Sequence, residues 1–180
     1  MVFLTGPMAG SAEFPQIHEV RVGQKAPEWE VADWFNSHPL RLSDLRGKVL
    51  LVRFWTGPDC PYCRASAPAL NEFYERYRKQ DFDLIGLYHH KSSAPLSKKA
   101  IAELIEQYGF QFPVAIDHNW TTLNRWWLQG EPKPWSSVSF LLDKKGVVRH
   151  IHTGGQYIKG DEAYADLQTR IAELLGEEGP

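Results

Sequence analysis

The chain has 180 residues, 43% of them hydrophobic and 13% aromatic, which is enough apolar material for one compact domain and excludes global disorder. Twenty Lys and Arg against 22 Asp and Glu give a net charge of −2 without a basic stripe, so nucleic-acid binding is not expected. No apolar run approaches the roughly 20 residues of a membrane-spanning helix, so insertion into a membrane is not expected.

The first 20 residues differ in character from the rest of the chain. They are rich in glycine, proline and small residues and show no sustained hydrophobic period. We predict a flexible extension over residues 1–20 and a single domain over residues 21–177. The segment lacks the basic start and the long apolar core of an intact signal peptide. The protein is therefore expected to be periplasmic if a signal or anchor was removed, and cytoplasmic otherwise.

The first predicted elements are a strand, a turn and a helix. Residues 49–55 form a nearly continuous apolar run, which is typical of a central strand covered on both faces. Residues 56–59 then read as a turn. The helix that follows has apolar positions at spacings of four, three and four, as one buried face requires. These positions are Cys63, Ala67, Leu70 and Tyr74.

The middle of the chain continues the alternation of strands and helices. Residues 81–88 predict a second strand, and residues 112–116 predict a short third one. Between them, Ser97 is a suitable N-cap and Gly109 a suitable C-terminal stop for a helix. A short helix is expected through Leu123, Trp126 and Trp127.

The last part of the chain predicts a hairpin and a helix. Residues 138–142 and 146–152 flank a turn in which Gly146 can adopt a positive φ. Asp161 can cap the final helix. Strands separated by helices pair in parallel, and the hairpin adds antiparallel pairs. We therefore predict an α/β fold with a central mixed sheet flanked by helices.

Both cysteines, Cys60 and Cys63, lie within four positions of each other. A disulfide between them would enclose almost no chain and would restrict the unfolded state little. Two thiols also fall short of the four ligands of a closed zinc site. Redox chemistry is therefore the preferred role, and no metal or other cofactor is expected.

The position of this pair favours disulfide exchange. It lies at the predicted start of a helix, whose partial positive charge and unpaired N–H groups stabilise a thiolate. Pro61 suits the first helical turn. We expect Cys60 to be exposed and to attack a substrate disulfide, and the more buried Cys63 to resolve the mixed disulfide. A strand-to-turn-to-helix setting makes the Cys-x-x-Cys spacing a strong signal.

Further segments carry a resemblance to the thioredoxin superfamily, in the branch of TlpA/ResA-like thiol-disulfide oxidoreductases and AhpC/TSA domains. The similarity runs from about Gly23 to Leu175. The matching segments are residues 23–29, residues 42–49, Phe54-Trp55, Pro68, and residues 140–143 with Gly146. The resemblance implies a thioredoxin-like fold and a protein disulfide oxidoreductase. Its partners would be a disulfide- or thiol-containing protein substrate and a thiol electron donor or acceptor, and the chain is expected to be monomeric.

The resemblance also implies substrate contacts beside the redox pair, for which Trp55, Ser136 and Ser137 are the candidates. Counting back from Asp143, Ser137 occupies the position of the family's cis-proline. A cis bond before a residue other than proline costs about 2.5–4 kcal/mol, so we expect a trans bond with Ser137 opposite the cysteines. Pro132 or Pro134 beside Cys60 would contradict this count.

Two other positions depart from the family. Ser66 replaces the acidic residue that ResA-like proteins carry three residues after the second cysteine, and Arg53 replaces the aspartate of thioredoxin. A proton acceptor must then come from elsewhere. His89 and His90 follow the second strand at its C-terminal end and are the candidates, although surface histidines are common there.

Two alternative functions are also open. A peroxiredoxin-like peroxidase would use Cys60 on peroxide, but Gly57 stands where such enzymes usually carry Thr or Ser. An SCO-like copper chaperone would need His150 and His152, which share one strand face. The tryptophans at 120, 126, 127 and 135 are expected mainly in the core, with one or two lining a groove near Cys60.

Overall fold

The computed structural model describes residues 20–91, 95–129, 132–154 and 156–179. Apart from Val20, the extension predicted for residues 1–20 lies outside these ranges. Within them the strands are β1 (Ala32–Phe35), β2 (Val49–Trp55), β3 (Phe82–Tyr88), β4 (Val114–Ile116), β5 (Val138–Leu142) and β6 (Val148–Thr153). The helices are α1 (Pro61–Tyr77), α2 (Lys98–Tyr108), α3 (Thr121–Leu123), which continues as a π-helical segment Asn124–Leu128, and α4 (Glu162–Gly176).

These strands form one mixed sheet in the order β1-β4-β3-β2-β5-β6. The β2–β3 and β3–β4 pairs are parallel, and β5 and β6 add antiparallel pairs. This topology confirms the predicted mixed sheet with a late hairpin, whose turn residue Gly146 has φ +74°. The strand β1, antiparallel to β4 at the sheet edge, was not predicted.

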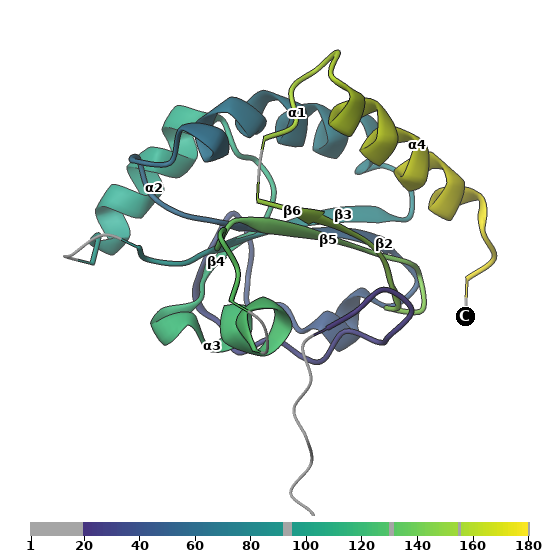
Figure 1. The fold of residues 1–180 in the computed structure, drawn as a ribbon, viewed down its shortest axis with the longest axis horizontal. Coiled ribbons are helices and arrows are strands. Elements are labelled where there is room, and N and C mark those ends of the chain that lie inside the picture. The colour runs from purple at the N-terminus through teal and green to yellow at the C-terminus, as the bar shows by residue number, and fades with distance from the viewer. Residues whose placement is uncertain (1–19, 92–94, 130–131, 155, 180) are drawn as a thin grey trace, which may run out of the picture.

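The helices divide between the two faces of the sheet (Figure 1). One face carries α1, α2 and α4, which bury residues such as Phe73, Ile105 and Ile171 against the sheet. The other face is covered by α3 and by the segment that precedes β2, with Trp29 and Trp126 in its core. The central strand β2 is buried along its whole length between these layers, as its apolar run predicts.

The predicted helix boundaries follow from local capping. Ser97 Oγ accepts a hydrogen bond from the Ala100 N–H at the start of α2, and Asp161 does the same for the Tyr164 N–H of α4. Gly109 ends α2 in a left-handed conformation with φ +70°, which only glycine adopts at little cost. These three expectations are confirmed.

Candidate active site

Cys60 and Cys63 form a disulfide at the N-terminus of α1, with their Cα atoms 5.3 Å apart. Cys60 is the N-cap, Pro61 is the first helical residue, and the Cys60 sulfur accepts a hydrogen bond from the Cys63 N–H at 3.2 Å. Cys60 is partly exposed, whereas Cys63 is only 3% exposed. The expected order of exposure is therefore confirmed.

This position gives the two sulfurs different environments. After reduction, the Cys60 sulfur would keep the helix N-terminus and the Cys63 N–H as stabilising partners for a negative charge. Cys63 lies inside the first turn, behind Cys60 and away from solvent. The arrangement fits an attacking thiolate with a resolving thiol behind it.

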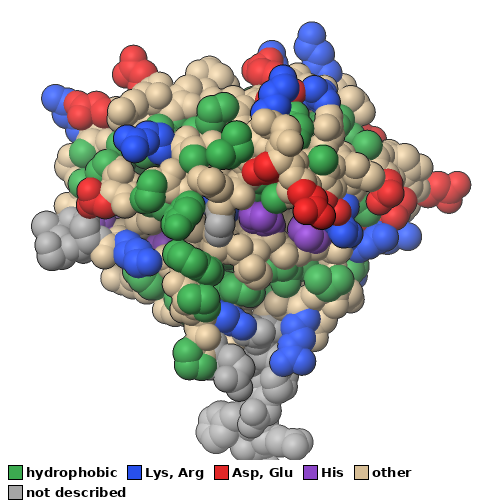
Figure 2. Space-filling view, turned by 45° about the horizontal axis from the view of Figure 1, so that its top comes forward, with side chains coloured by type: hydrophobic (Ala, Val, Ile, Leu, Met, Phe, Trp, Pro, Cys, Tyr) green, Lys and Arg blue, Asp and Glu red, His purple; other side chains and the backbone are tan. Residues whose placement is uncertain are grey.

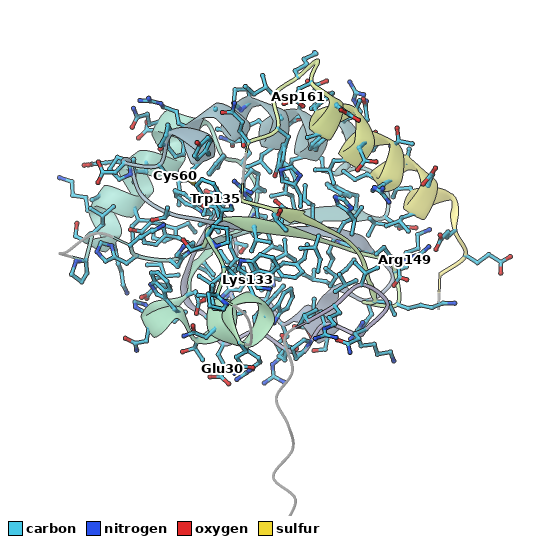
Figure 3. The ribbon with its side chains drawn as sticks, viewed as in Figure 1. Glu30, Cys60, Lys133, Trp135, Arg149 and Asp161 are labelled. Carbon is cyan, nitrogen blue, oxygen red and sulfur yellow. A yellow bond between two sulfur atoms is a disulfide. The ribbon has the colours of Figure 1, made fainter. Side chains whose placement is uncertain are left out.

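A cleft of about 340 Å³ opens beside the disulfide. One side is aromatic, because the Tyr62 and Trp135 rings meet edge to face with centroids 5.6 Å apart. Both side chains are exposed, at 39% and 43%. The lining residues are Thr56, Gly57, Asp59, Cys60, Pro61, Tyr62, Lys91, Trp135, Ser136, Ser137 and Gly154. Figure 3 shows Cys60 and Trp135 at the same end of the sheet, far from Arg149.

Exposed hydrophobic side chains also gather in a run on the face drawn in Figure 2. The large hydrophobic side chains with the greatest exposure in the described ranges are Val22, Tyr62, Trp135 and Ile158. Two of them, Tyr62 and Trp135, line the cleft beside the disulfide. The greatest aromatic exposure in the described ranges therefore lies beside the disulfide.

Trp135 is held in place by its surroundings. Its carbonyl accepts a hydrogen bond from the Trp127 indole N–H at 2.8 Å, and the Lys133 ammonium lies over the Trp127 ring. Gly154, with φ +63°, packs directly against the Trp135 ring, and a Cβ at that position would collide with it. Trp126 and Trp127 are buried, so the tryptophan cluster divides between core and cleft as expected.

Ser137 lies opposite the two cysteines. Its Oγ is 3.5 Å from the Cys63 sulfur and 4.0 Å from the Cys60 sulfur. No cis peptide bond occurs among the described residues, so the bond before Ser137 is trans. Neither Pro132 nor Pro134 lines the cleft, and the count from Asp143 is confirmed.

The other two candidates for substrate contact differ in exposure. Ser136 lines the cleft, and its buried Oγ has no hydrogen-bond partner among the described residues. Trp55 is only 2% exposed and packs edge to face on Tyr88 and Phe110. Trp55 therefore lies in the core, where a substrate does not reach it, and Ser136 and Ser137 remain candidates for substrate contact.

The two candidate proton acceptors lie in different surroundings. His89 is fully buried with its ring against Trp120, and neither ring nitrogen has a partner in the described chain. Burial lowers the pKa of His89 to about 3, which makes its imidazole a weak base. His90 is partly exposed, and its Nδ1 lies 3.0 Å from the Tyr88 hydroxyl. These properties favour His90 over His89.

Four buried polar side chains next to the first turn of α1 contact one another, and only two of them, Ser66 and Arg53, were singled out from the sequence. Ser66 donates a hydrogen bond to the Tyr62 carbonyl and accepts one from the Tyr157 N–H at 3.3 Å. The Tyr157 hydroxyl lies 3.1 Å from Ser139 Oγ, which accepts a bond from the Arg53 guanidinium. Tyr157 escaped sequence reasoning because it lies in a segment without periodicity, between β6 and α4.

Neither a metal site nor a membrane span emerges from the described part of the chain. There, no three histidine, cysteine, aspartate or glutamate side chains are grouped so as to hold a metal ion. His150 lies 3.9 Å from Asp166, and the His152 ring packs on Tyr157. None of the helices described here is long and apolar enough to cross a membrane.

Comparison with known proteins identifies the family. The AhpC/TSA family model matches residues 22–151. The thiol-disulfide oxidoreductase ResA of Geobacillus kaustophilus is 33% identical over 141 residues, covering 78% of this chain and 74% of ResA. ResA of Bacillus thuringiensis strain Al Hakam is 30% identical over 151 residues, which are 84% of this chain and 80% of that protein.

Solved structures agree with the sequence comparison. The crystal structure of a thiol-disulfide isomerase from Corynebacterium glutamicum superimposes with a TM-score of 0.66 and 28% identity, covering 85% of this chain and 98% of that one. The residues matched by the AhpC/TSA family model include both cysteines and the strand β2 before them. The chain therefore belongs to the AhpC/TSA family and is a thiol-disulfide oxidoreductase with a thioredoxin-like fold.

Proposed function

We propose that this protein exchanges disulfides with an extended polypeptide bound in the cleft between the Tyr62–Trp135 pair and Ser136–Ser137. In the reducing direction, the Cys60 thiolate attacks the substrate disulfide, which forms a mixed disulfide and releases one substrate thiolate. The Cys63 thiolate then attacks the Cys60 sulfur and releases the second substrate thiolate. Two electrons pass to the substrate, and the Cys60–Cys63 disulfide forms.

The unequal exposure of the two sulfurs is the observation that carries this proposal. Cys60 is reachable from the cleft, while Cys63 is 3% exposed. A substrate sulfur can therefore meet Cys60 first, and Cys63 is the only other sulfur in the chain that can resolve the product. Since either form of the pair can react with a partner, the same two steps run backwards when a reduced substrate is oxidised.

The cleft supports a polypeptide as the substrate. Its aromatic side can take an apolar side chain next to the reacting cysteine, as clusters of tyrosine and tryptophan do in interfaces. Ser136 and Ser137 add polar residues to the wall of the cleft beside the two cysteines. Lys91 and Asp59 add one charge of each sign to the lining.

Insulin reduction, measured beside peroxide consumption, tests this function. We expect the protein to catalyse reduction of insulin disulfides by dithiothreitol and to consume peroxide no faster than the Cys60→Ser variant does. Cys60→Ser should abolish insulin reduction, while Cys63→Ser should trap a mixed disulfide through Cys60. Peroxide consumption that depends on Cys60, without insulin reduction, would replace the proposal by a peroxidase.

The proposed reaction involves side chains of this chain and an external thiol that donates or accepts the electrons. His90 is the proposed proton acceptor, since it is the more accessible of the two histidines beyond β3. Its partner hydroxyl, Tyr88, lies close to Gly57 at the cleft. A His90→Gln variant that stays folded and exchanges disulfides more slowly would support this role, and an unchanged exchange rate would remove it.

A further inference from the structure

A buried arginine, Arg53, lies on the central strand β2, two residues before the end of the strand that leads to the two cysteines. Arg53 is 1% exposed and sits between Leu51 and Trp55, on the face of β2 that α1 and α4 cover. The strand register pairs it with Ser139 of β5, whose Oγ accepts a hydrogen bond from the guanidinium at 3.2 Å. The guanidinium also lies over the Tyr157 ring, 5.5 Å from its centroid.

The strand β5 connects this arginine to the redox pair. Ser139 and Ser137 are two residues apart, so their side chains project from the same face of the sheet. Ser139 contacts Arg53, and the Ser137 Oγ lies 3.5 Å from the Cys63 sulfur. The guanidinium is thus linked to the buried sulfur through two alternate positions of the same strand.

A second route leads from the arginine to the same sulfur. The Tyr157 hydroxyl lies 3.1 Å from Ser139 Oγ, and the Tyr157 N–H donates to Ser66 at 3.3 Å. Ser66 is three residues after Cys63, which is one turn of α1 away. Arg53 is thus fixed relative to the helix that carries the cysteines as well as to the strand opposite them.

Arg53 supplies a permanent positive charge in the protein interior. Burial lowers the pKa of its guanidinium, but an arginine stays protonated in proteins at every physiological pH. The same charge contributes to the lowered pKa values of His89 beyond β3 and His152 on β6. Both histidines are neutral at pH 7. The charged groups that line the cleft on its outer side are Asp59 and Lys91.

We propose that the buried charge of Arg53 makes the Cys60–Cys63 disulfide easier to reduce, by stabilising the sulfur charge that appears only in the reduced pair. Reduction takes two electrons from an external dithiol, breaks the S–S bond and leaves two sulfurs as thiol or thiolate, while the donor becomes a disulfide. The disulfide itself is neutral. A nearby cation therefore favours the reduced form alone, and the pair becomes a better oxidant.

This inference rests on the proposed exchange function for its biological meaning, but its test does not require a polypeptide substrate. Wild type and Arg53→Met are equilibrated in glutathione buffers at pH 7, and the oxidised fraction of the pair is measured by alkylation and mass spectrometry. We expect Arg53→Met to shift the equilibrium about tenfold toward the disulfide, equivalent to about 30 mV. Arg53→Lys, which keeps a charge, should shift it less. Equilibria equal within twofold, or a shift toward the dithiol, would overturn the proposal.

The matched control separates charge from packing. Tyr157→Phe removes a hydroxyl from the same buried group but leaves the guanidinium in place, so its equilibrium should stay within threefold of wild type. A Tyr157→Phe shift as large as that of Arg53→Met would assign the effect to packing and overturn the proposal. Urea unfolding of each variant shows that the domain is folded.

A second measurement applies if Arg53→Met does not fold. In the Cys60→Ser variant, Cys63 is the single thiol, and its pKa is read from thiolate absorbance. Burial alone would raise this pKa above the ordinary value of about 8.5. The helix N-terminus lowers this pKa as well, so the value is compared between Cys60→Ser and Cys60→Ser combined with Arg53→Gln. A higher pKa in the double variant supports the arginine's effect, and an equal or lower one overturns the proposal. Failure of insulin reduction with an intact Arg53 effect would remove only the proposed function.

Discussion

The hydroxyl of Ser137 lies 3.5 Å from the sulfur of Cys63, at the wall of the cleft beside the disulfide. A hydroxyl group thus occupies the place opposite the two cysteines in this chain. A hydroxyl can donate a hydrogen bond, which proline cannot. The Cys63 thiolate therefore has a neutral donor within reach on the strand opposite α1.

Ser137→Ala should slow the step in which Cys63 resolves the mixed disulfide. A hydrogen bond to a charged group contributes about 1.5–3 kcal/mol, so we expect a rate at least about tenfold lower. The measurement is the decay of a mixed disulfide formed between Cys60 and a chromogenic thiol. Formation of that mixed disulfide should change much less, and equal decay rates in wild type and variant would contradict the assignment.

Trp135→Ala should weaken binding of a polypeptide without impairing the sulfur chemistry. A central aromatic anchor contributes about 2 kcal/mol to an interface, equivalent to about 30-fold in affinity. We expect KM for insulin to rise while the rate with dithiothreitol alone is retained. Val22→Ala, which removes another exposed hydrophobic side chain outside the cleft lining, is the matched control. A loss of the dithiothreitol reaction would show that Trp135 does more than bind.

Gly154→Ala should disturb the cleft through the same tryptophan. Both Gly154 and Gly160 have positive φ, of +63° and +94°, but a Cβ on Gly154 would strike the Trp135 ring and one on Gly160 would meet open space. Each alanine should cost about 1 kcal/mol of stability from backbone strain. Only Gly154→Ala should also lower insulin reduction. Equal insulin reduction by the two variants would show that this activity does not depend on the present position of the Trp135 ring.

Acid should destabilise the fold through its buried histidines. Burial lowers the pKa of His89 to about 3 and that of His152 to about 4, from an ordinary value of 6.5. Below pH 6.5 the unfolded chain binds protons that the folded chain does not, so the free energy of unfolding falls as pH falls. Each histidine contributes a slope of up to about 1.4 kcal/mol per pH unit down to its folded pKa.

His89→Phe should reduce the slope of the unfolding free energy against pH by the contribution of one histidine. The substitution keeps a ring against Trp120 and removes two buried nitrogens that lack partners, so stability at pH 7 should rise by about 1 kcal/mol. Chemical unfolding between pH 4 and 7 measures both effects, at about one-unit steps. A steeper slope, or a variant that is inactive in disulfide exchange, would mean that His89 has a role in the active site.

Local signals in the sequence predicted the parts of the molecule that local chemistry determines. The apolar run of β2, the caps Ser97 and Asp161 and the stop at Gly109 each depend on residues within one turn of themselves. The strand β1 could not be predicted in this way. It has four residues and positive φ at Asp33, and its pairing is settled by β4, 79 to 84 positions away in the chain.

The site was predictable where it follows from spacing and less so where it follows from packing. Cys60, Cys63 and Ser137 come from a motif and a count of residues, and the structure brings all three together. The burial of Trp55 and His89 depends on a side chain of α2 and on Trp120 just before α3, and no motif connects either of them to the site. The contact between Arg53 and Ser139 likewise follows from the register of β2 with β5.

The form of β1 has a consequence for self-association. Its register shifts between Ala32 and Phe35, and Asp33, at φ +53°, is engaged by Lys98 and by His118. A second molecule would meet a short, kinked ladder with a charged group at its centre. Irregular edges of this kind prevent sheets of neighbouring molecules from joining into fibrils or insoluble aggregates. The irregular form of β1 thus makes this edge of the sheet a poor template for pairing with a second molecule.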